Sequence, residues 1–138
     1  MVSFTVGFYL YDIGTSSFLH SFFSTVAYRI ENGKWGSKFP IIMNELYQGR
    51  LSYENAPIAK KELKKIKKRL SKFSPDKVVW DIEDLSKQPP WGNNISDDIT
   101  SLANYYVTSS GVDFIEVFNE VLDKSIEIKK DILIQWFL

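Results

Sequence analysis

Residues 2–30 read VSFTVGFYLYDIGTSSFLHSFFSTVAYRI, and the spacing of their apolar residues changes partway along. At the start the side chains alternate, which is typical of a strand; one side of it would carry Phe4, Val6, Phe8 and Leu10. After the break at residues 12–17, apolar residues recur at helical spacing: Phe18, Leu19, Phe22, Phe23, Val26, Ala27 and Ile30. Asn32 and Gly33 are residues that commonly end a helix. We therefore predict a strand followed by a helix that turns its aromatic rings toward the core.

The rest of the chain predicts three more helices. The first is short, has Pro40 in its first turn and ends at Gly49; it carries Phe39, Ile42, Met43, Leu46 and Tyr47. The second begins near Pro57 and has a narrow apolar stripe of Ala59, Leu63, Ile66 and Leu70. The last has a core stripe of Phe114, Val117, Phe118, Val121 and Leu122. We expect five phenylalanines in the core, namely Phe18, Phe22, Phe23, Phe114 and Phe118.

Two further segments read as strands, KVVWDI at residues 77–82 and Asn104–Thr108. The C-terminal segment is open between two structures. Its apolar residues alternate as in a strand, yet their spacing could also extend the last helix: Ile126, Ile128, Ile132, Ile134 and Trp136. Strands and helices do not alternate as repeated units. The predicted fold class is therefore α+β, with a small, mostly antiparallel sheet of about three or four strands covered by about four helices.

The composition predicts one domain over residues 1–138. Of the 138 residues 44% are hydrophobic, and single domains typically hold about 100 to 150 residues. The chain has no cysteine, which excludes disulfides, thiolate metal sites and cysteine nucleophiles and suits a reducing compartment. The N-terminus lacks the basic start of a signal peptide, and the longest uncharged stretch, residues 13–28, is shorter than the roughly 20 apolar residues of a membrane span. We expect a soluble, cytoplasmic protein that does not contact a membrane.

Charge is distributed unevenly along a chain whose formal net charge is zero. Residues 57–77 hold nine Lys or Arg against two acids, a balance of +7, whereas residues 81–123 hold nine acids against Lys87, a balance of −8. The plain interpretation is two solvated surfaces. Such asymmetry otherwise influences association with partners more than it influences the fold.

Residues 78–99, VVWDIEDLSKQPPWGNNISDDI, combine two tryptophans, two consecutive prolines and five acids. Consecutive prolines remove backbone donors and Gly-Asn-Asn forms turns, so a loop is predicted after residue 87. Asp81 and Glu83 would share one face of a continuing strand, which is the least that a divalent cation needs. A catalytic metal would also need groups that align a substrate, and these are missing.

Each notable side chain of this loop has a structural interpretation beside a functional one. Ser96 or Asn94 could cap a helical turn whose first residues include Asp97 and Asp98, where acids are favourable. Trp80 is expected at the edge of the core. Trp91 could lie there too or, if partly exposed, anchor a partner. We predict that the loop binds a basic protein partner through six residues: Asp81, Glu83, Asp84, Trp91, Asp97 and Asp98.

Catalysis is not expected. His20 is the only histidine, and a helical position between Leu19 and Ser21 is more often structural. No GxSxG motif, P-loop, dinucleotide fingerprint or pair of metal-binding histidines occurs in the sequence. We therefore predict that the protein is not an enzyme and has no catalytic residues, no bound metal and no organic cofactor.

Three segments resemble the immunity protein 70 family of bacterial polymorphic toxin systems: GSKFPIIMNELYQG, WDIEDLSKQPPWG and YYVTSSG. The resemblance covers approximately Phe4 to Asp123 and leaves residues 124–138 as a tail outside it. It implies a small protein that protects its producer by binding the catalytic domain of a cognate toxin. Inhibition would then follow from blocking the toxin's active site or locking the toxin in an inactive conformation. The resemblance supplies neither catalytic residues nor a toxin-binding surface.

The alternative is a nucleic-acid-binding module that uses the basic segment 57–77. Clustered cations can neutralise phosphates, and this segment offers Lys60, Lys61, Lys64, Lys65, Lys67, Lys68, Arg69 and Lys72. The neutral chain and the apolar stripe of the same helix favour a solvated helix, so nucleic acid is the less favoured partner. A weaker alternative is that the lysines contact an acidic region of a second copy; the sequence does not decide the oligomeric state.

Overall fold

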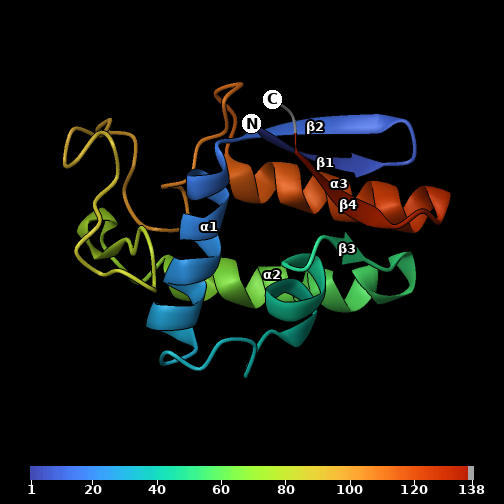
Figure 1. Ribbon diagram of the computed structural model, residues 1–138, viewed down its shortest axis with the longest axis horizontal. Coiled ribbons are helices and arrows are strands. Elements are labelled where there is room, and N and C mark those ends of the chain that lie inside the picture. The colour runs from blue at the N-terminus through green and yellow to red at the C-terminus, as the bar shows by residue number, and fades with distance from the viewer. Residues whose placement is uncertain (137–138) are drawn as a thin grey trace.

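The computed structural model describes residues 1–136, and within them four strands form one antiparallel sheet (Figure 1). The strands are β1 (Val2–Val6), β2 (Tyr9–Gly14), β3 (Arg50–Leu51) and β4 (Ile132–Trp136). Their order across the sheet is β2-β1-β4-β3, so the first and last strands of the chain are neighbours in its centre. The sheet therefore joins the two ends of the sequence.

Helices occupy the positions that the apolar spacing predicts. The first, α1 (Ser16–Thr25), continues as a π-helical turn, η1 (Val26–Ile30), and a second π-helical turn, η2 (Ile41–Leu46), follows Pro40. The longer helices are α2 (Ala56–Leu70) and α3 (Phe114–Ile128), and the short turns η3 (Tyr53–Asn55) and η4 (Pro75–Lys77) flank α2. The four predicted helices and the α+β class are confirmed.

The layers place α1 at one end of the molecule. α3 packs on β1, and α2 packs on α3. Figure 1 shows α1 running across the direction of α2 and α3, on the side from which the loop of residues 78–99 extends. The start of α1 and this loop therefore share one end of the protein.

The alternating run at the N-terminus is two strands, not the single strand that its pattern predicts. Gly7 takes the left-handed backbone conformation (φ 58°), and the chain reverses at Gly7 and Phe8 so that β2 pairs with β1. Phe8 is consequently fully exposed and Leu10 half exposed, whereas a single strand would have put both on the same side as Phe4 and Val6, which are buried. Glycine takes this conformation without steric cost, which allows a tight turn inside an alternating pattern.

Two other predicted strands are irregular segments. Residues 77–82 do not join the sheet, because the backbone N–H of Val79 donates to Oγ1 of Thr25 (3.0 Å) instead of to a neighbouring strand. Residues 104–108 make a single isolated bridge, at Val107. Both strand predictions are therefore wrong, although Val79, Trp80, Tyr105 and Tyr106 of these segments are buried.

The C-terminal segment, which the sequence leaves open between helix and strand, ends α3 and enters the sheet. Lys129 takes the left-handed conformation (φ 56°), which stops the helix after Ile128. β4 then pairs with β1 along its length, with Val2 opposite Trp136, and with β3 at residues 132 and 133.

Aromatic rings from three elements form the centre of the core. Phe22 of α1 meets Phe114 of α3 edge to face, with ring centroids 4.8 Å apart. Phe4 of β1 lies 5.6 Å from Phe118 in the same geometry, and such pairs add to the energy of burial. All five phenylalanines expected in the core are buried: Phe18, Phe22, Phe23, Phe114 and Phe118.

We predict that Phe22→Ala lowers the free energy of unfolding by about 3 to 5 kcal/mol, because it leaves a cavity among these rings. Phe8→Ala is the matched control and should change it by less than about 0.5 kcal/mol, since the Phe8 ring is exposed. Urea denaturation of both variants measures the difference. An unchanged midpoint for Phe22→Ala would contradict this packing.

Candidate functional site

Buried hydroxyl groups of α1 hold the beginning of the acidic loop. Oγ1 of Thr25 accepts the N–H of Val79 and also lies 3.0 Å from the carbonyl oxygen of Val79. The Ser21 hydroxyl donates to that carbonyl at 2.9 Å. Oγ of Ser24 accepts the N–H of Ile82 at 3.1 Å. One face of α1 therefore supplies the hydrogen bonds that a neighbouring strand would otherwise give this segment.

The phenol of Tyr106 fastens the segment that follows the loop of residues 78–99 to the same helix. Its hydroxyl donates to the carbonyl oxygen of Ser21 (3.0 Å) and lies 2.7 Å from Oγ1 of Thr25. The ring packs edge to face on Phe18 and Phe22, at 5.5 Å from each. Complete burial raises the pKa of Tyr106 well above its ordinary value. The phenol therefore stays protonated, and the start of the loop and the segment that follows it are both attached to α1.

Farther toward the start of α1, His20 connects the loop to η2. Its Nε2 lies 3.2 Å from Oδ1 of Asp81, and its Nδ1 lies 3.2 Å from the hydroxyl oxygen of Tyr47. The imidazole also stacks on Trp35, with centroids 6.4 Å apart. An imidazole protonated on Nε2 satisfies both hydrogen bonds, because it donates to Asp81 and accepts from the Tyr47 hydroxyl. His20 is thus a connecting residue between two distant segments.

Asp81 is the charged centre of this arrangement. The backbone N–H of Glu83 donates to its carboxylate at 2.9 Å and holds the pKa of Asp81 below its usual range, and hydrogen bonds from His20 and Lys87 lower that pKa further. Burial raises the pKa of the Tyr47 hydroxyl, and the negative charges of Glu83 and Asp81 raise it further. The cluster therefore combines an ionised carboxylate with a protonated phenol.

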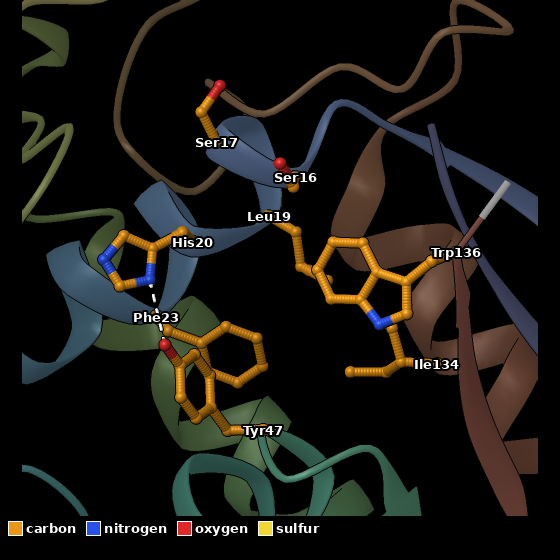
Figure 2. A pocket seen from close by; sticks show the side chains of 8 residues that line it. All are labelled: Ser16, Ser17, Leu19, His20, Phe23, Tyr47, Ile134 and Trp136. Carbon is orange, nitrogen blue, oxygen red and sulfur yellow. Dashed lines mark hydrogen bonds between the residues drawn. The ribbon is translucent and has the colours of Figure 1, made fainter. Parts of the chain in front are cut away.

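A pocket of about 400 Å³ opens between the first turns of α1 and the end of β4 (Figure 2). Its lining comprises Ser16, Ser17, Leu19, His20, Phe23, Tyr47, Ile134 and Trp136. Within the described residues, β3 pairs only with residues 132 and 133 of β4. The following residues of β4, Ile134 and Trp136, border the pocket. The indole of Trp136 is 66% exposed. The walls are mainly apolar, with hydroxyl and imidazole groups at their edges.

The two tryptophans of the loop contact each other on another side of α1. Trp80 is buried, as predicted, and meets Trp91 edge to face at 5.3 Å. Nε1 of Trp91 donates to the Tyr105 hydroxyl at 2.8 Å, while 39% of Trp91 stays exposed. A second pocket, of about 300 Å³, is lined by Phe18, Trp91, Asn94, Ile95, Ser96, Ile99, Tyr105 and Val107. Trp91 is therefore both held in place and accessible.

The six residues predicted to bind a partner occupy different parts of this end of the protein. Asp81 lies beside His20, and Trp91 lies at the second pocket. Glu83 and Asp84 follow in the exposed loop, where the Ser86 hydroxyl holds the pKa of Asp84 below its ordinary value. The remaining two, Asp97 and Asp98, are exposed within the segment that borders the second pocket.

Ser96, one of the two predicted caps, does cap a turn at Asp97 and Asp98, but the turn is a single one that starts no helix. The N–H of Asp98 donates to Oγ of Ser96 at 3.3 Å, which closes a local turn, and no helix follows in residues 99–113. Asn104 instead bonds back to this region, with its side-chain amide donating to the carbonyl oxygen of Asp98 at 3.1 Å. Local side-chain hydrogen bonds have replaced the helix start.

The basic residues predicted as an alternative binding surface lie on and just after α2. Lys60 forms an ion pair with Asp123 of α3. Glu62, an acidic residue of the same helix, is buried and accepts the backbone N–H of Ile42 at 2.9 Å. Burial raises the pKa of Glu62. Binding of nucleic acid to the lysine face stays a prediction.

Neither a cluster of metal-binding side chains nor a membrane-spanning helix is found in the part of the chain that the structure describes. Among residues 1–136, no group of three or more histidine, aspartate or glutamate side chains is arranged to hold a metal ion. None of the helices in this range combines the length and the apolar character needed to cross a bilayer.

The comparison with protein families gives the assignment. The family model described as immunity protein 70 matches residues 4–134. The chain belongs to the immunity protein 70 family. The family match extends into β4 and so includes most of residues 124–138. The resemblance seen in the sequence ended at Asp123 and left this segment out. Residues 137–138 lie outside the described range. No curated protein and no solved structure matches this immunity protein 70 family member.

The sequence interpretation of this family member missed three side chains of the site. Tyr47 was assigned only to an apolar helical stripe, Trp136 only to an ambiguous tail, and Tyr106 only to a strand. Asp81 was identified, but its partner His20 lies 61 residues away in the chain. No local spacing could have paired them, although a lone histidine on a helix was a weak signal.

We predict that Tyr106→Phe lowers the free energy of unfolding by about 1 to 3 kcal/mol, because buried hydroxyl and carbonyl groups lose a partner. The amide of Val79 should also exchange faster with solvent. Tyr28→Phe is the matched control, since Tyr28 is 39% exposed, and should leave both quantities unchanged. Chemical denaturation and hydrogen exchange provide the measurements. Identical stability and exchange in Tyr106→Phe and the wild type would contradict the proposed anchoring.

Proposed function

We propose that this chain is a cytoplasmic immunity protein that binds the catalytic domain of a cognate bacterial toxin and neutralises it stoichiometrically. The observation that carries the proposal is the match to the immunity protein 70 family over residues 4–134. The protein inhibits by occupation: it blocks entry of the toxin's substrate or holds the toxin in an inactive conformation. It performs no reaction of its own.

The contact surface that we propose is the acidic loop, with Asp81, Glu83, Asp84, Trp91, Asp97 and Asp98. Residues 81–98 hold these five acids and one base, Lys87. A basic cleft on the toxin would be attracted to this charge, which increases the rate of association and disfavours acidic partners.

Trp91 supplies the anchor of this surface. The hydrogen bond to Tyr105 and the contact with Trp80 fix its ring before a partner arrives. A fixed, partly exposed ring loses little conformational entropy when it is buried, so more of the contact energy appears as affinity. The ring and the surrounding acids thus support different parts of the binding process.

The direct test is co-expression with the C-terminal toxin domain encoded by the neighbouring gene. We expect the two proteins to co-purify and the producing cells to survive, whereas cells with the toxin domain alone should stop growing. Failure of the wild-type chain to bind or protect would reject the proposed function.

We predict that removing the exposed acids chiefly slows association and weakens its salt dependence. The combined variant is Glu83→Gln, Asp84→Asn, Asp97→Asn and Asp98→Asn. Binding rates measured at several salt concentrations test the prediction, and the matched control is Glu54→Gln with Glu127→Gln, two acids outside residues 81–98. A wild-type association rate for the folded loop variant would remove these acids from the contact surface.

We predict a different effect for Trp91→Ala. Loss of the ring should accelerate dissociation by roughly tenfold or more and leave the association rate nearly unchanged. Its folding is checked by thermal denaturation, and Phe8→Ala serves as the control for loss of an exposed ring. A wild-type dissociation rate for Trp91→Ala together with a wild-type association rate for the acid variant would redirect the search to the lysine face of α2.

A further inference from the structure

The pocket between α1 and β4 lies outside the contact surface proposed above, apart from the hydrogen bond of His20 to Asp81. Figure 2 shows His20, Phe23 and Tyr47 on one side of it and Trp136 with Ile134 on the other. Its volume of about 400 Å³ lies within the range of pockets that bind ligands or side chains. An amphipathic group of moderate size would therefore fit it.

The hydrogen bonds of the pocket determine the polarity that an occupant needs. The Tyr47 hydroxyl uses its one proton toward Nδ1 of His20, at 3.2 Å, when the imidazole donates from Nε2 to Asp81. The oxygen of Tyr47 then keeps lone pairs but has no proton to offer. Tyr47 is 42% exposed, so these lone pairs are accessible to an incoming group. This end of the pocket calls for a hydrogen-bond donor.

Electrostatics selects a cation as that donor. The negative charges of Glu83 and Asp81 both act on the Tyr47 hydroxyl. The positive end of the α1 dipole lies at the opposite edge of the pocket, near Ser16, and such fields fall off within the first helical turn. A positive group is thus favoured beside Tyr47.

The apolar walls specify the remainder of the occupant. Ile134 is half-buried and Trp136 is exposed, so these two residues offer apolar surface for a methylene stem, whereas Leu19 and Phe23 of the lining are buried. A planar guanidinium stacks on aromatic rings and donates several hydrogen bonds, whereas a lysine ammonium is a strongly hydrated point charge. These features favour arginine over lysine.

We propose that this pocket receives an arginine side chain of the cognate toxin domain, with its stem against the apolar wall and its guanidinium donating to the Tyr47 hydroxyl oxygen. The inference rests on the proposed function and adds a second contact to the acidic loop. Trp136 covers the stem from the opposite wall. Tyr47 and Trp136 are consequently determinants of toxin recognition.

A probe without the toxin tests the pocket itself. Nα-acetyl-arginine amide, followed by NMR, should shift the backbone signal of Leu19 and the indole signal of Trp136, with a dissociation constant on the order of millimolar. The neutral isostere Nα-acetyl-citrulline amide should bind about tenfold more weakly. Equal titration by both probes would overturn the proposal. Stronger shifts with Nα-acetyl-glutamate amide would do the same, because they would place an anion at the start of α1.

Variants with the toxin domain test the contact in the complex. Trp136→Ala and Tyr47→Phe should each weaken binding by roughly tenfold, and Phe8→Ala, an exposed ring elsewhere, should not. One surface arginine of the toxin, when changed to glutamine, should cost the same affinity and show no additional loss in combination with Trp136→Ala. Thermal denaturation confirms that the variants are folded.

The outcomes separate the two proposals. If the wild type binds and protects while both folded pocket variants bind equally well, the pocket proposal is wrong and the proposed function stands. If the wild type neither binds nor protects, the proposed function and the toxin-arginine assignment both fail, and the two amide probes then decide only whether the pocket prefers a guanidinium.

Discussion

The buried hydroxyl of Tyr106 is the contact on which the end of the protein with the proposed contact surface depends. It donates to the Ser21 carbonyl and lies beside the Thr25 hydroxyl, which in turn holds the backbone of Val79. An isolated polar group at this depth would cost free energy, but the hydrogen bonds between helix and loop satisfy it. Because the network is buried, it can hold a long irregular loop in one position without help from the sheet.

The start of α1 gains its proposed role from this attachment. Its aromatic side packs into the core, its hydroxyl side holds the loop, and its exposed turns separate two pockets. Phe18 borders the pocket at Trp91, whereas Leu19 and His20 border the pocket at Trp136. For an inhibitor that must recognise another protein, such a prearranged surface limits the entropy lost on binding.

The elements that the sequence predicts well are the helices whose apolar spacing extends over several turns. The apolar stripes of α1, α2 and α3 identified those helices and the five core phenylalanines, because helical spacing directly reports a buried face. Short runs were less informative. Residues 77–82 have the composition of a strand, yet the side chains of α1 satisfy their backbone, and a turn at Gly7 divides the first alternating run.

The site was predictable only in part for the same reason. The acids and Trp91 were found because they lie together in one loop of unusual composition. Tyr47, His20 and Trp136 meet through the tertiary fold, from segments that are far apart in the chain, and nothing in their neighbouring residues indicates the contact. The family match, by contrast, extends over residues 4–134 and needs no knowledge of the site.

The central claim is that a toxin domain binds the end of the protein formed by the start of α1, the acidic loop and the end of β4. Hydrogen–deuterium exchange of the chain, alone and in complex with the neighbouring toxin domain, tests it most directly. We predict slower exchange in residues 16–20, 81–99 and 134–136 and no change along the lysine face of α2. Protection confined to residues 57–77, in a complex that still neutralises the toxin, would contradict it.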